Sequence, residues 1–190
     1  MQPAATRGAV HQHPGISLLT LRAVEKETLA AALATLHARF EYPTPRLALG
    51  ARLRAVASAC IDVSDGLYGD ASKLAAASSC AVHIDPQRLP RSPALATAVA
   101  AGVFSGAEAE GFTASGGDDY ELLFTMPQAR WAEWQKGLAD QSAAYQPVAI
   151  TPIGYVEAHD GLRMTLAGKP VDRAALGIER SGWDHFSISA

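Results

Sequence analysis

One acidic segment, Ile61-Asp62-Val63-Ser64-Asp65-Gly66, leads directly into apolar residues at helical spacing: Leu67, Ala71, Leu74 and Ala75. Apolar residues three and four positions apart form one face of a helix, so we expect a helix to begin immediately after the acidic segment. The free amide groups and dipole of a helix N-terminus favour ionised carboxylates and can hold phosphate. The chain must therefore fold so that an acidic loop opens a helix.

The overall composition is that of a folded globular protein. The 190 residues are 48% hydrophobic, which suits one good-sized domain with an appendage. A net charge of -3 without blocks of like charge argues against binding to nucleic acid or to an anionic membrane. Two distant cysteines, the lack of a signal peptide and the lack of an apolar run of about 20 residues predict a cytoplasmic protein.

Helical and strand patterns alternate along the chain and predict an α/β fold, or a mixed α+β fold. Residues 1 to about 22 have no sustained period, 24–40 have a helical one, and a second helix is expected through Leu49, Leu53 and Val56. Strands are expected over 120–126 and 148–156, and then over 162–166.

The acidic segment has the chemistry of a metal and phosphate site. Asp62 and Asp65, with the Ser64 hydroxyl between them, offer the hard oxygen ligands that Mg²⁺ prefers, usually one or two carboxylates plus substrate phosphates. A simpler alternative is that Ser64 or Asp65 only caps the helix. The familiar phosphate-binding and hydrolase signatures are absent from the sequence, so ATP chemistry here would need another scaffold.

A second candidate site lies in Ser115-Gly116-Gly117-Asp118-Asp119-Tyr120-Glu121. Paired glycines allow unusual backbone conformations, and they place Asp118 and Asp119 at the start of the predicted strand. So many neighbouring acids are easier to tolerate beside a cation. The alternative is a plain turn, since turns favour aspartate.

Four motifs in one order resemble the C-terminal half of the thiamine-monophosphate kinases. They are Tyr42-Pro43-Thr44-Pro45-Arg46, Ile61 to Leu67, Ser115 to Leu122, and Gly182-Trp183-Asp184-His185-Phe186. The resemblance implies transfer of the γ-phosphate of ATP to thiamine monophosphate with Mg²⁺, giving thiamine diphosphate. It also implies the fold of the superfamily that includes aminoimidazole ribonucleotide synthetase and selenophosphate synthetase. Residues 41–190 would form its C-terminal domain, a mixed sheet with flanking helices, and residues 1–40 a tail and linker helix left from a missing N-terminal domain.

The resemblance also implies roles for individual residues. Asp62 and Asp65 match magnesium-binding aspartates, and Ser64 matches a serine that contacts the nucleotide. Asp118 stands where the family usually has a substrate-contacting glutamate, so its side chain is one methylene shorter here. Trp183 matches an aromatic substrate contact, and no covalent nucleophile is expected, because metals and positioning carry phosphoryl transfer.

The family's N-terminal half supplies further metal ligands and most of the dimer interface, and residues 1–40 contain no match to it. A homodimer is therefore expected of the full-length family rather than of this chain. Three hypotheses remain open: half of a thiamine-monophosphate kinase, an inactive remnant that folds or binds ligand weakly, or another ATP-dependent member of the superfamily. The Trp183-Asp184-His185-Phe186 run favours the thiamine branch.

Overall fold

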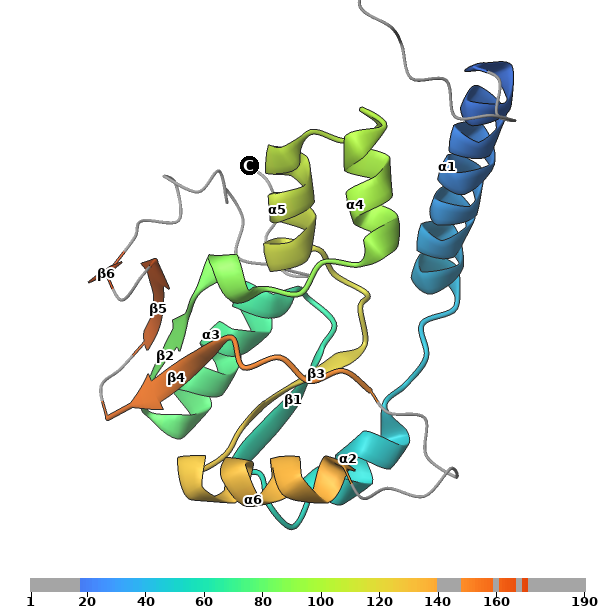
Figure 1. Cartoon of the computed structure of the whole chain (residues 1–190). Coiled ribbons are helices and arrows are strands. Elements are labelled where there is room, and N and C mark those ends of the chain that lie inside the picture. The colour runs from blue at the N-terminus through green and yellow to red at the C-terminus, as the bar shows by residue number, and fades with distance from the viewer. Residues whose placement is uncertain (1–17, 140–147, 159–160, 167–168, 171–190) are drawn as a thin grey trace, which may run out of the picture.

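The computed structural model describes residues 18–139, 148–158, 161–166 and 169–170 (Figure 1). The helices and strands follow one another in the order α1 (Leu18–Glu41), α2 (Leu47–Leu53), β1 (Ala59–Val63), α3 (Leu67–Ser78), β2 (Ala81–Ile84), a 3₁₀ turn (Pro86–Arg88), α4 (Pro93–Ala100), α5 (Gly106–Ser115), β3 (Glu121–Thr125), α6 (Gln128–Ala139), β4 (Gly154–Glu157), β5 (Gly161–Leu166) and β6 (Lys169–Pro170). This mixture of helices and strands confirms the predicted α/β class.

The main core lies between α3 and a four-stranded sheet. The strand order is β4-β2-β5-β6, with β4 antiparallel and β5 parallel to β2, so the predicted mixed sheet is present. All four residues of β2 are buried, as expected for a strand with neighbours on both sides and a helix on one face. The cluster of buried side chains joins α3 to β2 through Tyr68, Ala71, Leu74, Ala75, Val82 and Ile84.

Among the described residues, β1 and β3 form a second, two-stranded sheet, paired antiparallel with Ile61 opposite Leu123. These two residues pack against the α3 core. On the other face Phe124 makes an edge-to-face contact with Trp134 of α6, with ring centroids 6.0 Å apart. Figure 1 shows α6 and α2 next to this β1–β3 ribbon.

Serine caps explain where two of the surface helices begin. The Ser92 hydroxyl accepts a hydrogen bond from the Leu95 amide at the start of α4, and Pro93 occupies the first turn. Ser105 and Glu108 form a reciprocal capping box at the start of α5. Helix α4 also packs against α1 (Figure 1).

Several predicted boundaries differ from the observed ones. Helix α1 begins at Leu18 rather than Val24, and α2 ends at Leu53, because its last turn loosens before Val56. The strand expected over 148–156 is shorter and later, Gly154–Glu157. Across the described parts of the chain, no helix combines the length and apolar character needed to cross a membrane.

Candidate functional site

The two candidate motifs lie side by side at one end of the β1–β3 ribbon. We call residues 64–66 the first loop and residues 116–120 the second loop. The Asp118 amide donates to the Ser64 carbonyl at 2.9 Å, and the Tyr120 amide donates to the Val63 carbonyl at 2.8 Å. These bonds continue the β1–β3 pairing into the loops, and they join two segments that are far apart in the sequence.

Glycine allows the two loops to approach this closely. A Cβ at Gly66, whose φ is +100°, would lie 2.7 Å from the Ser115 carbonyl oxygen. A Cβ at Gly117 would lie 2.8 Å from the Ser64 carbonyl oxygen. Both distances are shorter than normal carbon–oxygen contacts, so the backbones can meet here only because side chains are absent.

The second loop holds two residues in the left-handed region of backbone space. Asp118 has φ +64° and Tyr120 has φ +50°. Such conformations cost non-glycine residues about 1 kcal/mol or more, and they concentrate at functional sites, where the surrounding structure maintains them. Type I′ and type II turns also place residues in this region, and aspartate tolerates it, so this backbone fits the plain-turn alternative as well as a functional loop.

The buried Asp70, in the first turn of α3, holds the backbone of the first loop through hydrogen bonds. Asp70 is 1% exposed, and its Oδ2 accepts hydrogen bonds from the amides of Ser64 and Asp65, both at 3.0 Å. The N-cap position of α3 is Gly66, and no side-chain capping hydrogen bond is present there. Neither Ser64 nor Asp65 therefore occupies the N-cap position of α3.

A lysine provides positive charge at the first loop. The Lys73 ammonium donates hydrogen bonds to Asp65 Oδ2 and, at 2.9 Å, to Asp70 Oδ1. Its hydrogen bonds to Asp65 and then to Asp70 raise the pKa of Lys73 above its ordinary value. Asp62 is not in the loop as predicted: it lies in β1, where alternation of the strand leaves it exposed while Val63 is buried.

Two arginines hold the carboxylate that begins β3. Arg46 binds Glu121 in a bidentate manner, with N–O distances of 2.8 and 2.5 Å, and Arg39 donates to Glu121 Oε1 at 3.0 Å. Partial desolvation raises the pKa of the nearby Asp119 carboxyl, and Glu121 and Asp118 raise it further, whereas Arg39 opposes the shift. Of the three acids of this segment, Glu121 is thus the one whose carboxylate forms ion pairs with both arginines in the described part of the chain.

The structure brings four of the five predicted site residues to one end of the ribbon: Asp62, Ser64, Asp65 and Asp118. Trp183 lies outside the described residues. Within the ranges that the structure describes, no three or more His, Cys, Asp or Glu side chains are grouped so that they could hold a metal ion. The acids of the loops therefore form at most part of a metal coordination shell.

Sequence reasoning missed Asp70 and Lys73, which organise the first loop. Asp70 and Lys73 are three residues apart in a predicted helix. Because residues at this spacing lie on one helical face, the sequence could have predicted an ion pair between them. It also missed the partnership of Arg39 and Arg46 with Glu121, for which no local pattern exists.

Comparison with curated proteins finds relatives with one shared description, although no family model matches the chain. A thiamine-monophosphate kinase of Salmonella typhimurium is 37% identical over 175 residues, which are 91% of this chain and 48% of that protein. A thiamine-monophosphate kinase of Escherichia coli K12 is 36% identical over 76% of this chain and 40% of its own length. The chain thus spans about half the length of the curated relatives it matches.

Solved structures give the same result for the fold. The thiamine-monophosphate kinase of Stenotrophomonas maltophilia K279a superimposes with a TM-score of 0.60 at 33% identity, over 80% of this chain and 46% of that one. The protein AaThiL, solved with AMPPCP and TMP, superimposes with a TM-score of 0.63 at 32% identity, over 88% of this chain and 46% of that one. The fold is therefore shared with about half of each of these proteins.

Proposed function

Because the chain is homologous to the thiamine-monophosphate kinases over 91% of its length, we propose that it supplies about half of such an enzyme's active site. The reaction would be ATP-dependent phosphorylation of thiamine monophosphate to thiamine diphosphate. The complex of AaThiL with AMPPCP, an ATP analogue, and TMP supports these two substrates. The activity is a proposal for this chain because it covers 48% of the Salmonella relative.

The observation that carries this proposal is the direct backbone pairing of the first and second loops. The loop with the proposed metal and nucleotide residues is hydrogen-bonded, at Ser64, to the loop with the proposed substrate residue Asp118. Phosphoryl transfer depends mainly on positioning and charge stabilisation. A direct backbone connection between a proposed nucleotide loop and a proposed substrate loop meets that requirement.

The residues of the first loop fit a divalent cation. Lys73 already places a positive charge on the Asp65 carboxylate, so this position accepts a cation. We propose that Asp65 and the exposed Asp62 would hold Mg²⁺ through carboxylate oxygens, the ligands that this ion prefers. When bound, Mg²⁺ would supply neutralisation of the negative charge on the phosphates.

The other roles belong to the chain's own side chains. Ser64 would contact the nucleotide beside the N-terminal turn of α3, where Asp70 holds the local backbone in place. Asp118 would contact the thiamine substrate with a carboxylate one methylene shorter than the usual glutamate, and the left-handed backbone at Asp118 directs where that carboxylate reaches. Trp183 is proposed as the aromatic substrate contact. No side chain is assigned as a covalent nucleophile.

The remaining proposals concern the organisation of the protein. We propose that residues 41–190 form the synthetase-like domain and that residues 1–40 connect it to a further domain. A homodimer is proposed for the full-length family, and the cytoplasmic location stays a prediction.

A second candidate, an inactive chain that binds ligand weakly, is favoured by one observation. The described residues alone do not group three or more metal-binding side chains. In this case the loops would still bind nucleotide but would not turn it over.

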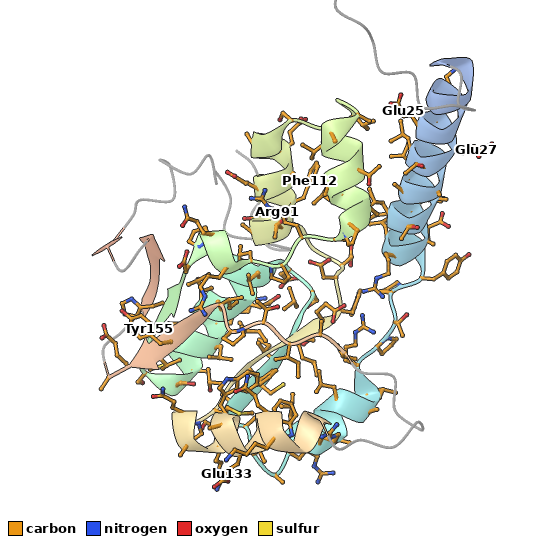
Figure 2. All side chains as sticks on the ribbon, viewed as in Figure 1. Glu25, Glu27, Arg91, Phe112, Glu133 and Tyr155 are labelled. Carbon is orange, nitrogen blue, oxygen red and sulfur yellow. The ribbon has the colours of Figure 1, made fainter. Side chains whose placement is uncertain are left out.

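Nucleotide binding tests the assigned site. We expect Mg²⁺-dependent binding of AMPPCP, measured by calorimetry, to weaken by about tenfold or more in Asp62→Ala, because a metal ligand is lost. The matched control is Glu133→Ala, since Glu133 is an exposed carboxylate on α6 (Figure 2). Unchanged binding in Asp62→Ala would refute the metal role.

Turnover tests both candidates, because each predicts that the 190-residue chain alone makes little thiamine diphosphate. Thiamine diphosphate formation by the purified 190-residue chain is expected to stay near background, because further metal ligands are expected from the other half of the enzyme. Robust turnover by this chain would show that the half-site proposal is wrong.

A further inference from the structure

Lys73 lies where the proposed metal would bind, yet the proposed function gives it no role. Its ammonium group, on the second turn of α3, bridges Asp65 and Asp70. The side chain of Lys73 is 53% exposed, that of Asp65 is 21% exposed and that of Asp70 is 2% exposed. The bridge therefore runs from a buried carboxylate to one that is open to incoming ligands.

The two ends of this bridge are not equivalent. Asp70 is fixed, because one of its oxygens accepts two backbone amides and the other accepts Lys73. Lys73 has a flexible stem with a compact charge that can move among several acceptors. The ammonium can thus leave Asp65 and remain on Asp70, its neighbour in the same helix.

Lys73 carries a positive charge at neutral pH. A lysine ammonium group is protonated throughout the neutral range at its ordinary pKa of about 10.4, and both partners of Lys73 here are carboxylates. A permanent positive charge at a carboxylate opposes the approach of a divalent cation to the same oxygens.

We propose that Lys73 is a built-in cation on Asp65 that a divalent metal must displace, and that it thereby sets the metal affinity of the first loop. This inference rests on the proposed function. Its consequence is that bare metal binds weakly, whereas metal accompanied by nucleotide phosphates brings its own negative charge and binds more readily. Lys73 is accordingly a positioning residue that couples metal binding to nucleotide binding.

The test measures Mn²⁺ affinity without nucleotide, by the electron paramagnetic resonance signal of the free ion. Lys73→Met removes the charge and keeps the apolar stem, and we expect it to tighten Mn²⁺ binding about tenfold. Lys73→Arg keeps the charge and should stay within about twofold of the wild-type chain. The control Lys136→Met removes an exposed lysine of α6 and should change nothing.

A purely structural role for Lys73 predicts the opposite sign, because loosening the loop would weaken Mn²⁺ binding. Equal or weaker binding in Lys73→Met, with an unchanged circular dichroism spectrum, overturns the proposal. If that variant does not fold, Lys73→Gln provides the neutral side chain instead, with the same expected direction and the same refuting result.

Adding Asp62→Ala to Lys73→Met separates this inference from the proposed function. If Lys73→Met tightens Mn²⁺ binding and the added Asp62→Ala change has no effect, the role of Lys73 stands and the assignment of Asp62 fails. If Asp62→Ala abolishes wild-type binding but Lys73→Met does not tighten it, the metal site stands and the inference about Lys73 fails.

Discussion

The four-stranded sheet and the β1–β3 ribbon pack against the same helix, α3, but they are stabilised in different ways. On the sheet side, Val82 and Ile84 are buried against apolar residues of α3. On the ribbon side, the loops are held by Asp70, by backbone hydrogen bonds and by the arginines on Glu121. Apolar burial supplies most folding free energy, whereas polar contacts mainly fix geometry. Buried side chains of the sheet therefore supply most of the folding free energy, and polar contacts at the loop end of the ribbon fix the geometry of the site. Ile61 and Leu123 of the ribbon also pack against the core.

The largest effect is expected from the sheet. Ile84→Ala should lower the free energy of unfolding by about 3 kcal/mol, because Ile84 is 1% exposed and its loss leaves a cavity. Urea denaturation measures this change. Leu47→Ala is the control, since Leu47 is 79% exposed and should lose no more than about 0.5 kcal/mol. If both variants lost the same unfolding free energy, burial of Ile84 in the sheet would not contribute specially to stability.

A smaller effect is expected where the loops meet. Gly66→Ala should lower the free energy of unfolding by about 2 kcal/mol, because its Cβ adds a backbone overlap to an unfavourable φ. Gly102→Ala shares a positive φ, +74°, but meets nothing within 4 Å, so about 1 kcal/mol is expected. The difference between the two losses of unfolding free energy reports the backbone overlap together with the less favourable backbone of Gly66, whose ψ is 147°. No difference would mean that the loops can separate at little cost.

The smallest effect is expected from Asp119, whose pKa is raised mainly by desolvation. A raised pKa means that the ionised carboxylate destabilises the folded state at neutral pH, and that this cost disappears as the pH falls below the ordinary value of about 3.9. Asp119→Asn should therefore stabilise the chain slightly at pH 7 and less at pH 4.5, in thermal melts. Glu133→Gln, on exposed α6, controls for losing one negative charge. If Asp119→Asn stabilised the chain more at pH 4.5 than at pH 7, the pKa of Asp119 would be lowered rather than raised in the folded state.

Local sequence patterns predicted α1, α2, α3 and α6, because the spacing of apolar residues is a local property, but they did not predict α4 (Pro93–Ala100) or α5 (Gly106–Ser115). Strands β1 and β2 were not predicted. In β1, Ile61 and Val63 alternate with Cys60 and Asp62, but two acids so close together are also typical of a loop. The pairing of β1 with β3 is a long-range contact that no local pattern specifies. Similarly, each site residue could be proposed from the sequence. That the two loops are joined by a hydrogen bond between Ser64 and Asp118 could be seen only in the structure.

Arg39 and Arg46 together form a clamp on the Glu121 carboxylate, and this clamp limits where the polypeptide can be divided. The predicted boundary after residue 40 falls between Arg39 and Arg46, although both guanidinium groups bind the same carboxylate. A protease cut or gene fusion at that boundary would keep Arg46 on Glu121 and remove Arg39. The last turn of α1 thus behaves as part of the unit that follows it, and a junction upstream of Arg39 would preserve the clamp.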